Sequence, residues 1–171
     1  MDQFSIYRKL PLTAMLAALA VVVPIFFHLL GLGSTFLPMF QPVVLGGFLL
    51  PLRLSLSVAV IAPFVSFIFT GMPPLYPPIL PVMILEMAAM CCIANLFYVK
   101  KNQNVWFTLF LTILLDRLIL LLIVLILAPL FGLPKFFSVV TLFHGVPGLV
   151  LMFLIIPGTI KFLNKRYQNL Y

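Results

Sequence analysis

The sequence predicts an all-α membrane protein with six transmembrane helices. Of its 171 residues, 64% are hydrophobic and only 8% are charged, whereas a soluble domain has about a quarter charged residues. Nearly all ionisable side chains stand at breaks between apolar runs, as a bilayer that excludes charge from its centre would require. No long linker, low-complexity tract or clear repeat interrupts the chain, so residues 1–171 are expected to form a single integral membrane domain.

Segment lengths predict where the chain crosses the membrane. A helix needs about 20 apolar residues to span a hydrocarbon core of about 30 Å. Four segments meet this length easily, 52–71 is just long enough, and 36–51 would measure only ~24 Å as a helix. The predicted helices lie at about 10–30, 36–51, 52–71, 79–99, 104–130 and 138–162. The first is longer than the apolar core of a signal peptide, so it is expected to be retained.

Positive charge decides whether the short segment 36–51 crosses. With six crossings and a cytoplasmic N-terminus, eight Lys and Arg residues lie inside and only Lys135 lies outside. Without this crossing, three would lie inside and six outside, against the positive-inside rule. The eight residues are Arg8, Lys9, Arg53, Lys100, Lys101, Lys161, Lys165 and Arg166. Both termini are therefore expected in the cytoplasm, and the net charge of +7 is attributed to topology rather than to nucleic-acid binding.

The expected external loops are about 31–38, 71–78 and 131–137. The middle loop has four prolines in eight residues, which fix the backbone and remove hydrogen-bond donors. Two interpretations remain open for this segment. It is either a rigid lid over an external site or a linker that ends one helix and begins the next.

Ionisable residues within the predicted spans are the first candidates for function, because hydrocarbon penalises charge. Glu86 is expected ~11 Å below the outer end of its helix, His144 ~9 Å below the outer end of the sixth helix, and Arg117 near the middle of the fifth. Gln41 is expected near the outer start of the second helix. Packing alone is the alternative interpretation of His144.

Two arrangements of Glu86 and Arg117 are possible. They form an ion pair that locks the bundle, or they line a polar cavity that opens outward and contact a ligand there. Asp116 is about 100° around the helix from Arg117, so the two are not expected to face each other, and Arg117 is preferred for the site. The three charges sum to about −1, which disfavours a phosphate-bearing ligand and suits a neutral or weakly basic one.

Other chemistry finds little support in the sequence. It has no metalloprotease, nucleophile-elbow or phosphate-loop motif and no paired acidic motif for a metal, so catalysis, a metal site and a cofactor bound by this chain are not expected. Cys91 and Cys92 are adjacent within an apolar run and are interpreted as small hydrophobic residues. The buried polar residues gather toward one side of the membrane rather than along a pore, which argues against an ion channel.

The first predicted helix carries a strip of small residues. Ala14 and Ala18 are one turn apart, which allows the backbone of another helix to approach closely. The strip serves either docking of a partner or packing within this chain.

Taken together, these features resemble the substrate-binding S component of energy-coupling factor (ECF) vitamin transporters. The resemblance covers nearly the whole chain and depends on the order and spacing of short motifs rather than on any single one. The motifs are Ala14 and Ala18, the segment 36–48, Ala62-Pro63, the segment 70–74, residues 85–87, residues 116–118, the segment 145–148 and residues 155–157.

The resemblance implies a six-helix fold and a vitamin or vitamin precursor held near the external face under loops 31–38 and 71–78. It implies that the helix-one strip, with Val22 where the family often extends the small residues, docks on a membrane coupling component driven by two ABC ATPases. Those partners would hydrolyse the ATP, and the S component would tip in the membrane to release its ligand. The expected ligand groups are Gln41, Glu86, Arg117 and His144, with Tyr76 and Met83 as walls around a heteroaromatic ligand.

Two other classes of protein are weighed against the S component. A non-transporting scaffold, similar to the small membrane subunits of rod-shape complexes, would have the same size and hydropathy but no ligand. A membrane enzyme would need a catalytic constellation that the sequence does not contain. A small molecule that co-purifies with the protein in detergent would separate the S component from the scaffold.

Overall fold

The computed structural model describes residues 3–76, 78–127, 129 and 145–166. Every regular element in the described residues is helical, which confirms the predicted all-α class. The long helices are α1 (Gln3–Leu29), α4 (Leu52–Thr70), α5 (Ile79–Ala94), α6 (Val105–Leu122) and α9 (Val146–Arg166). Between α1 and α4 lie the short helices α2 (Gly33–Phe36) and α3 (Phe40–Leu49), and π-helical turns η1 (Asn95–Lys100) and η2 (Ile123–Leu127) extend α5 and α6.

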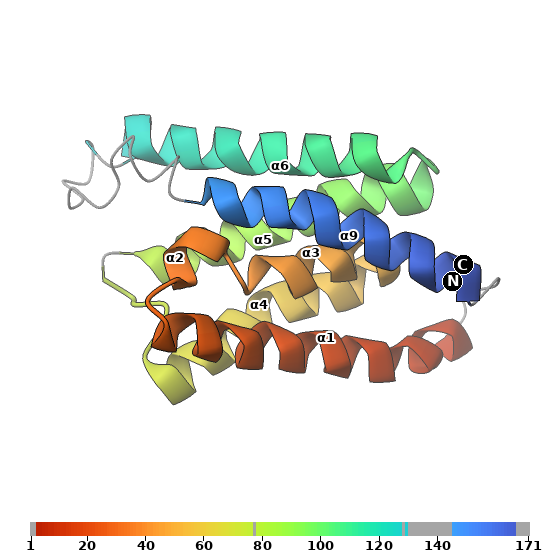
Figure 1. Cartoon of the computed structure of the whole chain (residues 1–171), viewed down its shortest axis with the longest axis horizontal. Coiled ribbons are helices and arrows are strands. Elements are labelled where there is room, and N and C mark those ends of the chain that lie inside the picture. The colour runs from red at the N-terminus through yellow and green to blue at the C-terminus, as the bar shows by residue number, and fades with distance from the viewer. Residues whose placement is uncertain (1–2, 77, 128, 130–144, 167–171) are drawn as a thin grey trace.

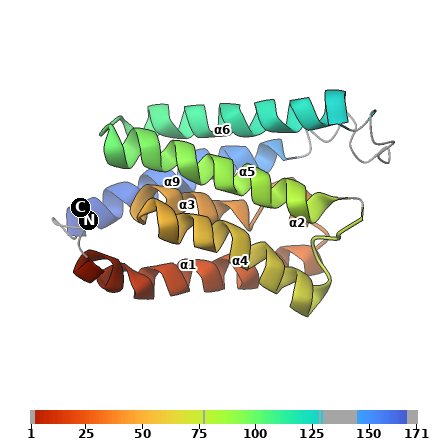
Figure 2. The ribbon, with the colours of Figure 1, turned by 180° about the vertical axis from the view of Figure 1, so that it is seen from behind.

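The long helices lie side by side along one axis, with α1 and α6 at opposite edges of the bundle and α3 in its middle (Figures 1 and 2). The chain begins and ends at the same end of the bundle (Figure 1). Five helices of the described residues are long and apolar enough to cross a membrane. The sixth passage along the bundle is made by α2 and α3 together.

The sixth passage differs from the single helix predicted over residues 36–51. Leu37 has left-handed dihedral angles (φ 47°, ψ 51°) and separates α2 from α3, and Leu50 is extended and ends α3. Both residues precede a proline, which disfavours the right-handed helical conformation at the preceding position. The ten residues of α3 measure ~15 Å, too short to cross a bilayer alone.

The short helix α3 is tolerated inside the bundle because its terminal carbonyl groups are paired. Eight of its ten residues are buried, so water cannot satisfy them. Lys9 Nζ on α1 donates to Leu49 O at 3.3 Å, and Asn95 Nδ2 at the end of α5 donates to Leu50 O at 3.0 Å. At Gly47 a Cβ atom would lie 3.1 Å from Cys91 Cα, so glycine lets α3 pack directly on α5.

Local signals define the other helix ends. Gly71 (φ 69°) ends α4 in the left-handed conformation that glycine favours, and its N–H donates to Phe67 O at 2.8 Å. The side chain of Asn104 caps α6 by accepting from the N–H of Trp106 at 3.0 Å. The last helix, predicted from residue 138, is described from Val146 onward, and residues 138–144 lie outside the described residues.

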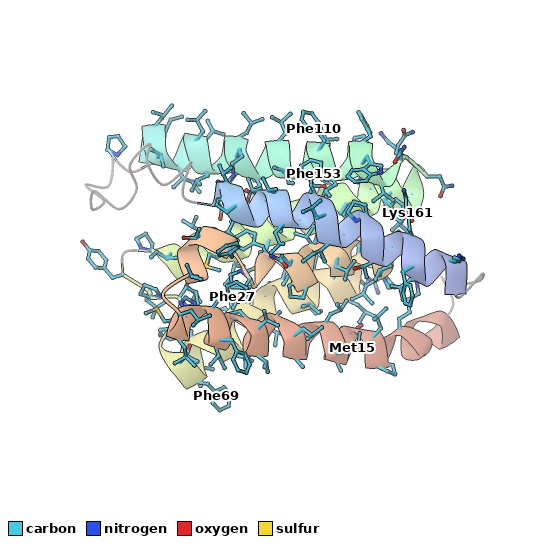
Figure 3. All side chains as sticks on the ribbon, in the orientation of Figure 1. Met15, Phe27, Phe69, Phe110, Phe153 and Lys161 are labelled. Atoms are coloured by element: carbon cyan, nitrogen blue, oxygen red, sulfur yellow. The ribbon has the colours of Figure 1, made fainter. Side chains whose placement is uncertain are left out.

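The outer surface of the bundle is apolar along its length. Met15, Phe69 and Phe110 project outward from α1, α4 and α6 (Figure 3) and are more than half exposed. At the end where the chain begins and ends, Lys161 Nζ lies 5.9 Å from the centroid of the Trp106 ring, and Lys101 Nζ lies 4.6 Å from that of Phe97. Aromatic rings beside cations are typical of the membrane–water boundary, and the positive-inside rule assigns this end to the cytoplasm.

Candidate functional site

Two buried acids face each other where α5 packs against α6. Glu86 on α5 is 5% exposed and Asp116 on α6 is 0% exposed. Asp116 continues a polar face on α6, because Thr108 and Thr112 precede it at four-residue intervals and are also fully buried. This i, i+4, i+8 spacing on an otherwise apolar helix is the sequence signal for Asp116, which the sequence analysis set aside in favour of Arg117.

Arg117 forms an ion pair with Asp116, its neighbour in sequence. Its Nη2 and Nε atoms lie 2.6 Å and 2.9 Å from Asp116 Oδ2. The expectation that these two residues do not face each other is therefore wrong. Their Cβ atoms do point in different directions, but the arginine side chain is long enough to bend around the helix toward the buried carboxylate.

Glu86 interacts electrostatically with both Asp116 and Arg117, so the three residues form one cluster. The two arrangements considered from the sequence, a Glu86–Arg117 lock and an open cavity, omitted the Asp116–Arg117 pair. One oxygen of each acid, Glu86 Oε1 and Asp116 Oδ1, is buried and has no hydrogen-bond partner in the described part of the chain. The cluster is therefore not a fully self-paired knot.

Two glycines bring the start of α9 and the α2–α3 connector to this cluster. A Cβ atom on Gly145 would lie 3.5 Å from Arg117 Nη1 and 2.8 Å from Leu37 Cδ1. A Cβ atom on Gly148 would lie only 2.4 Å from Phe36 O. The backbone of α9 is thus in direct contact with the connector between α2 and α3. The glycines of the segment 145–148, used above only as a family motif, are the sequence signal for this contact.

We expect Gly148→Ala to destabilise the protein by about 1–3 kcal/mol, because the added methyl group would collide with the backbone of Phe36. Gly158→Ala is the matched control on the same helix, since a Cβ atom there would have no neighbour within 4 Å. Alanine favours a helix over glycine, so the control is expected to unfold at the same or a slightly higher temperature. Thermal unfolding in detergent measures both; equal transitions for the two variants would exclude tight packing at Gly148.

The other predicted ligand residues lie in different surroundings. Gln41 Nε2 donates to Phe36 O at 3.3 Å, so it stabilises the α2–α3 connector. Met83 is partly buried and packs against the main apolar core. The side chain of Tyr76 is 76% exposed, so it does not belong to the buried cluster, and His144 lies outside the described residues.

An open pocket of about 220 Å³ lies on the other side of α2, at the ends of α1 and α4. Its lining includes His28 and Thr70 and, from the proline-rich loop, Met72. A Cβ atom on Gly33 would lie 2.5 Å from the ring of His28, so α2 rests on this pocket at its first residue and on α9 at its last. Figure 1 shows α2 between α1 and α9. The helix α2 therefore separates the pocket from the acid cluster.

The small-residue strip of α1 faces outward. Ala14 and Ala18 are exposed and Val22 is 48% exposed, whereas Leu16 and Ala20 are buried against the bundle. The outward direction favours contact with lipid or a partner over packing within this chain.

The fold and the cluster together define a class of protein: a small multi-pass helical membrane protein with a buried polar group enclosed at one end. A family model described as the substrate-specific component of ECF transporters matches residues 8–169. The chain belongs to this family, so it is a multi-pass transporter subunit rather than an enzyme, and it functions with a substrate and the partners of an ECF module. No curated protein and no solved structure matches it.

Proposed function

We propose that this S component binds a vitamin or vitamin precursor at the external face, in the cluster formed by Glu86, Asp116 and Arg117. The carrying observation is that this buried cluster is incompletely paired, since Glu86 Oε1 and Asp116 Oδ1 have no partner among the described residues. Uncompensated polar atoms in a membrane interior are costly and mark binding sites.

The position of the cluster supports an external rather than a cytoplasmic site. Glu86 is ~11 Å from the start of α5, whereas Lys100 ends η1 at the opposite, positively charged end of the bundle. The α2–α3 connector and the start of α9 cover the cluster on the same side as Glu86. Displacing α2 would join the cluster to the pocket at Met72, so α2 and the proline-rich loop are proposed to act together as the lid.

Delivery would use the outward strip of α1. Ala14, Ala18 and Val22 would dock on the membrane coupling component, and the whole subunit would tip in the membrane to release its ligand inside. ATP would be hydrolysed by two ABC ATPases, and this chain itself would bind no cofactor. The exposure of the strip supports this assignment, because small side chains allow close approach of a partner helix.

The test is uptake into proteoliposomes that contain this chain, the coupling component and both ATPases. Small molecules extracted from the purified protein serve as the transported mixture, and mass spectrometry identifies those that accumulate. We expect accumulation with ATP and none with a non-hydrolysable analogue. A protein that neither associates with the coupling component nor supports uptake of any extracted molecule would be a scaffold instead.

A further inference from the structure

The two acids of the cluster differ in how their oxygens are used. Asp116 Oδ2 accepts from two nitrogens of Arg117, whereas Asp116 Oδ1 and Glu86 Oε1 accept from no residue that the structure describes. Both side chains are more than nine-tenths buried. Carboxylate oxygens in an apolar interior bind N–H donors strongly, and charge-assisted hydrogen bonds are shorter and stronger than neutral ones.

The charge of the cluster selects the charge of its occupant. Glu86 interacts with both Asp116 and Arg117, and the three ionised groups together carry one net negative charge. A ligand with one positive charge would neutralise the cluster, whereas an anionic ligand would add to the excess. Because charges interact strongly where the dielectric constant is low, this difference decides which ligand class is accepted.

A metal ion fits these residues less well than an N–H donor. Among the residues that the structure describes, no group of three or more His, Cys, Asp and Glu side chains lies close enough to hold a metal. Two carboxylate oxygens from adjacent helices are instead matched by an amidine-like edge, in which a protonated ring nitrogen stands beside an amino group.

We propose that Glu86 and Asp116 are the paired acceptors of the ligand, and that the ligand is an amino-substituted nitrogen heterocycle bound as a monocation. This inference rests on the proposed function and specifies its substrate class. Asp116, which the sequence analysis did not place in the site, becomes a residue that determines specificity. Arg117 becomes a positioning residue, because it holds Oδ2 of Asp116 and leaves Oδ1 for the ligand.

The experiment compares two small probes on the full chain in lipid nanodiscs. 2,4-Diaminopyrimidine carries the proposed donor edge, and nicotinate is a ring of similar size with a negative charge. Binding is measured by ligand-detected NMR and calorimetry. We expect the diaminopyrimidine to bind about ten- to a hundredfold more tightly than nicotinate, the ratio that one or two charge-assisted hydrogen bonds provide.

Variants assign the effect to the two acids. Glu86→Gln and Asp116→Asn keep the shape of each side chain and are each expected to weaken diaminopyrimidine binding about tenfold or more without strengthening nicotinate binding to the same level. Thr108→Val is the matched control, since it removes a buried hydroxyl without a described partner from the same face of α6. A thermal transition close to that of the wild type shows that each variant is folded, and if Asp116→Asn does not fold, Glu86→Gln decides.

Three results would overturn the inference: equal binding of both probes, no binding of either at millimolar concentration, or unchanged binding in folded Glu86→Gln. An extracted native ligand that is anionic and lacks N–H donors would do the same. ATP-dependent uptake of that anionic ligand would leave the proposed function intact, so the two failures are distinguishable.

Discussion

Arg117→Met is expected to destabilise the protein by about 3 kcal/mol. The substitution removes the partner of Asp116 and leaves a fully buried carboxylate uncompensated, and breaking one side of a buried ion pair costs about 3–5 kcal/mol. The lower end of this range applies because the side chain of Arg117 is 21% exposed. Unfolding in mixed detergent micelles, monitored by circular dichroism, measures the change.

Two further variants show whether the loss arises from the unpaired acid. The double variant Asp116→Leu/Arg117→Met removes both charges and is expected to recover most of the lost stability, since an apolar pair can replace a buried ion pair. Lys161→Met removes a cation that is exposed at the end of the bundle and should change stability by no more than about 0.5 kcal/mol. If Arg117→Met were as stable as Lys161→Met, the Asp116–Arg117 pair would have no structural importance.

Ala18→Trp is expected to abolish assembly with the coupling component while leaving ligand binding unchanged. Ala18 lies on the exposed strip of α1, far from the acid cluster in sequence and on a helix at the edge of the bundle (Figure 1). A large ring there would prevent close approach of a partner helix, which small residues permit. Co-purification with a tagged coupling component and ligand binding by calorimetry measure the two properties.

Leu114→Trp is the matched control for docking. Leu114 is 43% exposed on α6, which lies at the opposite edge of the bundle from α1 (Figure 2). We expect this variant to assemble as the wild type does. Normal assembly of Ala18→Trp, or equal loss in both variants, would show that the strip is not the docking surface.

Much of the fold could be predicted because hydrocarbon restricts where charges and polar backbone groups lie. The positions of Arg53, Lys100 and Lys161 at one end of the bundle follow from the alternation of apolar runs and cations. The break at Leu37 was less accessible. Pro38 and Pro42 indicated a disturbed helix, but the division into α2 and α3 depends on carbonyl pairing by Lys9 and Asn95, which are distant in sequence.

The candidate site was predicted only in part. Depth estimates identified Glu86 and Arg117, but not the direction of their side chains, which long flexible residues choose according to their neighbours. The pairing with Asp116 therefore could not be read from helical geometry alone. Tyr76 was selected for its place in the proline-rich loop, and its exposure depends on how that loop folds back, which no local motif specifies.

The central claim is that Glu86 and its partners accept a ligand within the membrane interior. Native mass spectrometry of the protein purified gently from membranes tests it most directly. We predict a bound small molecule at about one copy per chain, retained by the Thr108→Val variant and lost from a folded Glu86→Gln variant. A wild-type protein with no bound molecule, or a ligand held equally by Glu86→Gln, would contradict the claim.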